Sequence, residues 1–267
     1  MRAVSLHRDV MVVTSQLFAA HCTIVRAPGG QHEAFAIDSP VLPEELELLP
    51  SLTEQAGFPA PRGLLATHGD WDHVLGPLAF DQATLGCAES TAARLQAQPG
   101  AAQRALRRFD EELHIEGRRP LSLGSIQALA VPGRCGIGDA ELELHPATGH
   151  TVDGMAVWIG WARVLVAGDY LSPIELPSLG EREPGGGADM LGSYLATLDR
   201  LRPLVTAAEH VVPGHGPAID GPAALGVLEE DLAYLHALRE HGADAELPAR
   251  RRSQVQRELH AQNAARV

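Results

Sequence analysis

Short apolar runs alternate with polar or Pro-Gly segments through the first third of the chain. These runs occupy residues 10–13, 17–25 and 34–37. The segment 27–30, with the sequence Ala-Pro-Gly-Gly, separates the second run from the third. Apolar runs of this length, bounded by turn-forming residues, are typical of strands. We therefore predict short strands joined by hairpins in this part of the chain.

A helix and another strand follow. Pro43 precedes two glutamates, and Gly57 follows the apolar and polar residues that come after them. Proline near the first helical position and acidic residues in the first turn are helix-start signals, so a helix from Pro43 to just before Gly57 is predicted. The apolar residues 63–66 then predict a buried strand. This succession of strand, helix and strand indicates the α/β class.

Similar patterns continue along the rest of the chain. Further strands are predicted at residues 83–87, 126–131, 142–145, 155–159, 164–167 and 208–212. Helices are predicted at residues 91–96 and 101–114, and two more follow at 225–235 and 251–262. The segment 172–189 is rich in proline and glycine, which predicts a loop or lid.

Metal-binding side chains are concentrated in the loop after the predicted strand at 63–66. Six consecutive residues, His-Gly-Asp-Trp-Asp-His at 68–73, hold two imidazoles and two carboxylates. Imidazole nitrogens and carboxylate oxygens are donors that bind divalent metal ions. Their spacing differs from the i and i+4 pairs of helical zinc motifs, so a loop is expected to carry them. We therefore predict a metal site here.

Other histidine and aspartate residues lie at the ends of predicted strands. His150, Asp169 and His215 each have a glycine neighbour, which lets the backbone turn sharply. Asp38 also ends a strand, although a carboxylate in that position, taken alone, is more often a simple turn former. Each of these residues alone is more often structural. Ligand types at several strand ends together predict one shared metal site.

Composition limits the class of partner. The chain has 267 residues, 45% of them hydrophobic, and a formal net charge of −13. The length fits one large domain or a domain with a small appendage. The negative charge argues against nucleic acid or an anionic membrane surface as a partner, because either requires clustered Lys and Arg. A small-molecule substrate is therefore expected.

The location of the protein is predicted from features that the sequence lacks. No apolar run approaches the roughly 20 residues of a membrane-spanning helix. Residues 1–10 have no apolar core of the kind found in secretory signals. The 3 cysteines are widely spaced, which favours reduced thiols over a disulfide framework. We expect a cytoplasmic protein with no membrane partner, and a homodimer is compatible with these features.

The order of these residues resembles the motifs of the metallo-β-lactamase superfamily. The resemblance spans roughly residues 10–218 and includes Asp38, the 68–73 loop, His150, Asp169 and His215. It implies an αββα sandwich, in which two mixed β-sheets lie face to face with helices outside. The metal site is then expected at one edge of the sandwich.

The resemblance also implies a role for each of these residues. A first metal ion would be held by His68, Asp70 and His150, and a second by Asp72, His73 and His215, with Asp169 bridging both. Asp72 and Asp169 would be the catalytic carboxylates, and Asp38 would brace the loop without touching a metal ion. Residues 1–220 would form the superfamily domain, and residues 221–267 a helical extension packed on it.

Asp70 departs from the family pattern, which has histidine at this position. A carboxylate there removes one positive charge from the site, so a bridging water would be acidified less effectively. Oxygen ligation also shifts metal preference from zinc toward iron or manganese. The flavodiiron reductases are similar in carrying a carboxylate at this position. We expect two divalent ions, with zinc favoured and iron or manganese as alternatives.

Three functions compete. The first is a hydrolase in which a metal-bridging hydroxide attacks an ester-type bond, with a thioester or lactone favoured and a phosphodiester as a further option. The second is an iron-dependent redox enzyme, either diiron or similar to the persulfide dioxygenases, for which His68, His150 and Asp169 would suffice. The third is a degenerate module that binds metal weakly. The hydrolase is the function that we predict.

Three more side chains near these motifs each have two interpretations. Trp71 would either line the substrate pocket or pack beneath the loop. Tyr170 would either donate its hydroxyl to a substrate oxyanion or be buried with that hydroxyl satisfied. Thr151 would either cap a backbone segment or brace the ligand His150 through hydrogen bonds.

Overall fold

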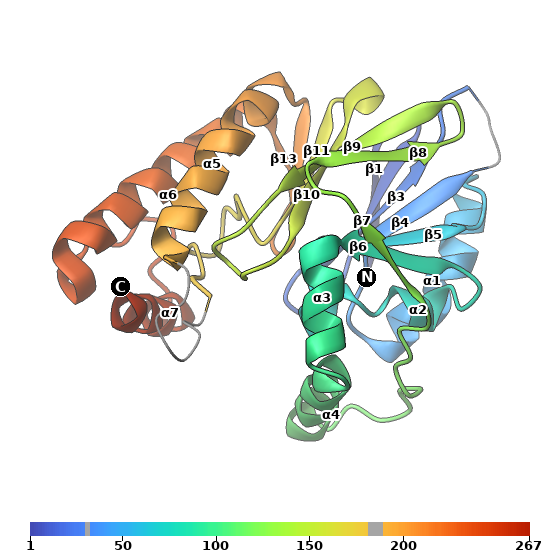
Figure 1. Cartoon of the computed structure of the whole chain (residues 1–267), viewed down its shortest axis with the longest axis horizontal. Helices are drawn as coiled ribbons and strands as arrows, with labels where there is room; N and C mark the ends of the chain where they lie inside the picture. Colours follow the sequence, from blue (N-terminus) through green and yellow to red (C-terminus); the bar gives the residue numbers. More distant parts are fainter. Residues whose placement is uncertain (30–32, 181–188) are drawn as a thin grey trace.

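Two β-sheets lie face to face in the computed structural model, which describes residues 1–29, 33–180 and 189–267 (Figure 1). The first sheet has the order β1 (Arg2–His7), β2 (Val10–Thr14), β3 (His21–Arg26), β4 (Ala34–Asp38), β5 (Gly63–Ala66), β6 (Thr84–Ala88), β7 (Ile126–Leu129). The second has the order β13 (Ile219–Asp220), β12 (His210–Pro213), β11 (Val164–Gly168), β10 (Met155–Ile159), β9 (Ala140–Pro146), β8 (Gly133–Ile137). Both sheets are mixed, because each contains parallel and antiparallel pairs.

Helices cover the outer face of each sheet (Figure 1). The first sheet is accompanied by α1 (Pro43–Gln55), α2 (Gly76–Ala79), α3 (Glu89–Ala97) and α4 (Ala101–Leu113). The second is accompanied by α5 (Met190–Ala207), α6 (Gly221–His241) and α7 (Gln254–Arg266). The layers confirm the predicted αββα sandwich. In the described part of the chain, no helix is both long enough and apolar enough to cross a membrane.

The middle of the core lies between the two sheets. Side chains alternate across a strand, so every second residue of each inner strand faces the opposite sheet. Val12 and Ile37 of the first sheet share one buried cluster with Val157 and Val166 of the second. Full burial of such a side chain contributes about 1.5–3 kcal/mol to folding. This packing fixes the two sheets relative to each other, and with them the loops at their common edge.

Parallel pairing brings the chemically important strand ends together. β4 runs parallel to β5, and β11 runs parallel to β12. Strands that run parallel end at the same edge of a sheet, where side chains from successive loops can meet. Asp38 at the end of β4 therefore lies beside the 68–73 loop after β5. Asp169 after β11 lies beside His215 after β12.

The structure corrects several of the predicted elements. The strand predicted at 17–25 begins only at His21, because Phe18 and Ala19 have φ values of 57° and 47°, which a strand does not allow. The patterns also do not predict α5, whose interior contains Pro203, a residue that normally interrupts helices. β1 and β8 are likewise missed, since β1 is largely exposed and β8 contains two glycines.

The last helix holds the irregular segment 172–180 in place. Gln256 of α7 accepts a hydrogen bond from the backbone N–H of Leu176 at 2.6 Å. Asn263 accepts from the N–H of Leu179 at 3.0 Å and donates to the carbonyl of Pro177 at 2.6 Å. The segment is therefore a loop, as predicted, but one that is fixed on α7. Residues 181–188 of the predicted loop lie outside the described residues.

Candidate metal centre

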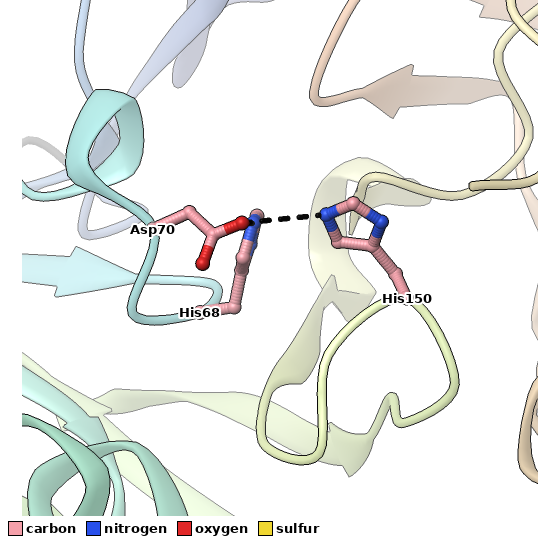
Figure 2. Close-up of side chains that lie close together, drawn as sticks. All are labelled: His68, Asp70 and His150. Atoms are coloured by element: carbon pink, nitrogen blue, oxygen red, sulfur yellow. Dashed lines mark ion pairs between the residues drawn. The ribbon is translucent and has the colours of Figure 1, made fainter. Parts of the chain in front are cut away.

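The first group of predicted ligands comes from one loop of each sheet. His68 and Asp70 lie in the loop after β5, and His150 lies in the loop between β9 and β10. The Nε2 atoms of both histidines lie 3.7 Å from Oδ2 of Asp70. Figure 2 shows the three side chains pointing toward one another, with one oxygen of Asp70 directed at the imidazoles.

The second group lies beside the first. His73 and Asp72 belong to the short 3-10 helix Trp71–His73, and His215 follows β12. Oδ2 of Asp72 lies 3.4 Å from Nε2 of His215 and 3.8 Å from Nε2 of His73. The ligand atoms of each group all lie within 4.8 Å of one another. Such spacing suits side chains arranged around a single ion.

Asp169 lies between the two groups. Its carboxylate oxygens are 3.2 Å from Nε2 of both His73 and His150, 3.4 Å from that of His215 and 3.9 Å from that of His68. A carboxylate placed between two sets of imidazoles can offer one oxygen to each set. The structure thus brings together all the side chains for which a ligand role was predicted.

Unpartnered polar atoms test whether these residues suit metal ions. Nε2 of His68, His73 and His150 and Oδ1 of Asp169 are buried and have no hydrogen-bond partner in the described part of the chain. A buried polar atom without a partner costs free energy, and such atoms normally mark a missing ligand or ion. Here they converge on one small volume. The donor set therefore fits divalent metal ions.

The other ring nitrogen of each histidine contacts an oxygen. Nδ1 makes hydrogen-bond contacts from His150 to the Ser178 carbonyl at 3.0 Å, from His215 to the Phe18 carbonyl at 3.3 Å and from His68 to the Thr67 hydroxyl at 3.1 Å. Nδ1 of His73 lies 3.0 Å from the Asp38 carboxylate, at ion-pair distance but without hydrogen-bond geometry. An acceptor at Nδ1 fixes the ring and leaves Nε2 available as a ligand atom. All of the Nε2 atoms face the common centre.

The charges of the site are strongly coupled. Burial alone would raise the pKa of Asp169, but the surrounding histidines outweigh it and hold that pKa well below its usual range. Burial would lower the pKa of His150 and His215, yet Asp169 beside them raises these pKa values to about 10 and about 9. Metal ions that bind here must therefore displace protons from His150 and His215.

Asp38 is placed as the sequence predicts, beside the loop. Its carboxylate accepts hydrogen bonds from the backbone N–H and the hydroxyl of Thr67, at 2.8 and 2.9 Å, and contacts His73. Asp38 has a φ of 57°, a left-handed conformation that Asp tolerates better than most residues. The bend turns its carboxylate toward the loop rather than into the sheet.

The other predicted residues fall in different environments. Trp71 packs against Phe109 of α4, with ring centroids 4.5 Å apart, and also lines a cavity. Tyr170 is only 3% exposed, and its hydroxyl accepts a hydrogen bond from the N–H of His150. This favours the structural interpretation of Tyr170 over contact with substrate. The Thr151 hydroxyl donates to the backbone carbonyl of Asp153 and so braces the His150 loop.

Three side chains at the site were not predicted from the sequence. Arg94 of α3 forms one ion pair with Asp70 and another with the buried Asp153. Glu175 lines a cavity together with Asp169 and His215. Burial raises the pKa of the Glu175 carboxyl. None of these residues follows a strand directly or belongs to a motif, so no pattern in the sequence singles them out.

The chain belongs to the metallo-β-lactamase superfamily, whose family model matches residues 59–215. That superfamily fold and the candidate metal cluster together support a metal-dependent, hydrolase-type function. A search of curated proteins found no match.

Solved structures with the same fold are distant in sequence. A metallo-beta-lactamase from Pontibacter korlensis is 19% identical, with a TM-score of 0.60 over 85% of this chain and 98% of its own. A metallo-beta-lactamase family protein from Thermus thermophilus is 18% identical, with a TM-score of 0.70 over 98% of this chain and 93% of its own. A stereoselective inverting sec-alkylsulfatase from a Pseudomonas species is 13% identical, with a TM-score of 0.72 over 98% of this chain and 49% of its own. At these identities the likeness shows the fold alone.

Proposed function

We propose that the protein is a hydrolase that uses two divalent metal ions, zinc before iron or manganese, to cleave an ester-type bond. A thioester or lactone is the favoured substrate, and a phosphodiester is the next. The observation that supports this proposal is the pair of ligand groups that meet at Asp169. A mononuclear iron site similar to that of a persulfide dioxygenase would need His68, His150 and Asp169 only. The presence of a complete second group favours a dinuclear site over this mononuclear alternative.

The residues around the site would divide the chemical work. When bound, the ions would polarise the scissile carbonyl or phosphoryl oxygen and acidify a water molecule. Asp169 would contribute ligand atoms to both ions, and Asp72 would contribute to the second ion only. Glu175, a carboxyl whose pKa is raised by burial, lines a small cavity together with Asp169 and His215 and would be the nearest candidate proton donor.

A cavity beside Asp70 supports a small molecule as substrate. It has a volume of about 320 Å³, and residues of the 69–71 loop, α3 and α4 line it. Its lining includes apolar side chains such as Trp71 and Leu95, together with the exposed Arg108, which forms no ion pair with any described residue. The cavity suits a substrate with an apolar portion, and its size is at the lower end of the range for small-molecule sites.

The experiment combines metal analysis with a substrate panel. Protein purified without chelator would be analysed for bound metals and assayed against thioester, lactone, phosphodiester and sulfate ester substrates. We expect two ions per chain and hydrolysis of a thioester or lactone. One or two irons per chain with oxygen consumption would support the redox alternative, and no bound metal would support the degenerate module.

A single substitution tests the central ligand. Asp169→Asn should reduce the content of both ions and abolish hydrolysis, because Asp169 contacts both ligand groups. The matched control is Asp81→Asn, which changes the same atoms at an exposed position outside the site. Retention of both ions by Asp169→Asn would contradict the dinuclear site.

A further inference from the structure

We propose that Arg94, held in place by Asp153, positions Asp70 as a metal ligand that offers a single oxygen. Asp70 would then replace the single nitrogen of the histidine that the family has at this position. The inference rests on the metal site proposed above and concerns residues for which no role was predicted.

The two oxygens of Asp70 face different partners. Oδ1 accepts a hydrogen bond from Nη2 of Arg94 at 2.6 Å. Oδ2 lies 3.7 Å from Nε2 of both His68 and His150. Figure 2 shows the same division, with one oxygen of Asp70 directed at the histidines and the other turned away from them. Arg94 therefore occupies the oxygen that a metal ion would not use.

Arg94 is itself fixed by a buried carboxylate. Nη1 of Arg94 donates to Oδ1 of Asp153 at 2.7 Å, and Asp153 has no exposed surface. Oδ2 of Asp153 accepts from the backbone N–H of Gly69 at 3.1 Å. Asp153 follows His150 by three residues in the sequence. The bridge from Asp153 through Arg94 to Asp70 thus joins the two loops that supply the first ligand group.

The bridge matters because a carboxylate differs from an imidazole as a ligand. A free carboxylate can bind an ion through one oxygen or through both, whereas an imidazole offers one nitrogen. A short, charge-assisted bond from a planar guanidinium fixes one oxygen strongly. Arg94 contacts Asp70 directly, so it both orients the Asp70 carboxylate and stabilises its negative charge, while Asp153 balances the charge of Arg94. Asp70 keeps its negative charge and gains a defined direction.

The first test measures zinc affinity by competition with a chromogenic chelator. Arg94→Met should weaken binding of one ion by roughly 10–100-fold, the usual effect of losing a residue that orients a ligand. Arg94→Lys should restore part of that affinity, because an ammonium can still reach one carboxylate. Arg104→Met is the control, since Arg104 is exposed on α4 and donates to the Pro99 carbonyl. The zinc affinity of Arg104→Met should equal that of the wild type.

A double variant separates positioning of Asp70 from general support of the loop. In an Asp70→His background, Arg94→Met should cause no further loss of zinc affinity, because the imidazole needs no guanidinium to limit it to one donor atom. An equal loss in both backgrounds would mean that Arg94 only supports the fold, and the inference would be wrong. The visible spectrum of the cobalt-loaded protein gives a second readout. It should indicate a higher coordination number in Arg94→Met than in the wild type.

The outcomes also separate this inference from the proposed function. If His150→Ala does not weaken zinc binding, the metal site itself is wrong. If His150→Ala weakens binding and Arg94→Met does not, only the role of Arg94 is wrong. If Arg94→Met fails to fold, the zinc affinities of Arg94→Lys and Asp153→Asn are compared in the wild-type and Asp70→His backgrounds instead. An unchanged affinity in both of these variants would overturn the inference.

Discussion

Asp169 explains how single residues at the site should respond to pH. Its buried carboxylate lies beside the histidines of both ligand groups and raises the pKa of His150 to about 10 and that of His215 to about 9. Unfolding would return both groups to the ordinary histidine pKa, near 6.5. Between these pH values, the metal-free folded protein binds more protons than the unfolded chain.

The metal-free protein should therefore lose stability as pH rises. The contribution of His150 and His215 is fully present below about pH 6.5 and is lost as pH rises through their raised pKa values. We expect the denaturant midpoint in the presence of chelator to fall between pH 7 and pH 10. The metal-loaded protein is the control and should show a smaller fall, since bound ions replace the protons. A midpoint that rises with pH in the metal-free protein would contradict these assignments.

The residues of the site differ in how far the sequence could predict them. His68, Asp169 and the other ligand candidates combine a donor type with a place at a strand end, and both features are visible in the sequence. Arg94 and Asp153 reach the site only through tertiary contacts from α3 and from the loop after β9. The family pattern indicated a histidine at position 70, but it carried no information about what would replace the histidine.

Among the elements, the loop after β5 connects the site to the cavity. Trp71 lies between two candidate ligands, Asp70 and Asp72, and its ring packs on Phe109 of α4 while lining the cavity. The position of Trp71 therefore combines the two interpretations that the sequence allowed. Its ring packs against a helix and also lines the cavity next to the metal centre.

Trp71→Ala should affect substrate binding more than metal binding. Loss of the ring would enlarge the cavity, and we expect KM to rise on the order of 10-fold, equivalent to about 1.4 kcal/mol. Metal content should stay at the wild-type level, because the substitution removes no donor atom. Trp71→Phe, which retains an aromatic ring, serves as the control in the same kinetic assay. A loss of metal from Trp71→Ala would show instead that the ring mainly supports the loop.

Helix α7 should influence the metal centre although it supplies no ligand. Asn263 makes hydrogen bonds to the backbone at Pro177 and Leu179, on either side of the Ser178 carbonyl that contacts Nδ1 of His150. Asn263→Ala should lower the free energy of unfolding by about 1–3 kcal/mol, because it leaves buried backbone groups unpaired. We also expect weaker binding of the ion held by His150, with the other ion less affected.

Two measurements check this expectation. Denaturant unfolding gives the change in stability, and a zinc titration by competition gives the two affinities. Gln262→Ala, at the exposed neighbouring position, is the matched control and should leave both unchanged. If Asn263→Ala lowers stability but leaves both affinities at the wild-type values, α7 has no influence on the ligand loop.

The elements themselves were predictable where the apolar pattern was local. Strands such as β5 and β11 are continuous buried runs, and their type and place are confirmed. Helix α5 packs Leu198 and Val205 against the second sheet despite Pro203 in its interior. In α5, tertiary packing outweighs the helix-interrupting effect of Pro203. Tertiary packing of this kind is not visible in the pattern of a single sequence.

At the scale of the whole molecule, the candidate site joins the two sheets. The 68–73 loop leaves the first sheet, whereas His150, Asp169 and His215 all leave the second. Ions bound between them would act as links across the sandwich. Such links stabilise the folded chain only, since the unfolded chain does not hold the ligands together.

Removal of metal should therefore lower the thermal midpoint. An ion at about 100 times its Kd stabilises a protein by about 2.7 kcal/mol. For a domain of this size, 1 kcal/mol corresponds to roughly 2–4 °C in Tm. We expect chelator to lower Tm by on the order of 5–10 °C per ion, measured by differential scanning fluorimetry. His150→Ala should show a smaller chelator effect, and an identical Tm with and without chelator in the wild type would exclude structural linkage by metal.

The hydrogen bonds from α7 also have a consequence for biosynthesis. Ribosomes make the chain from its N-terminus, so residues 254–266 emerge after every predicted ligand has been synthesised. A nascent chain that already contains His150 still lacks the helix that fixes the backbone around Ser178. The Nδ1 contacts of His73 and His215 are with Asp38 and Phe18, which lie outside the segment that α7 holds. Binding of the ion that His150 would hold should thus be the later event in the maturation of the protein. It should be complete only after α7 has packed against the segment 172–180.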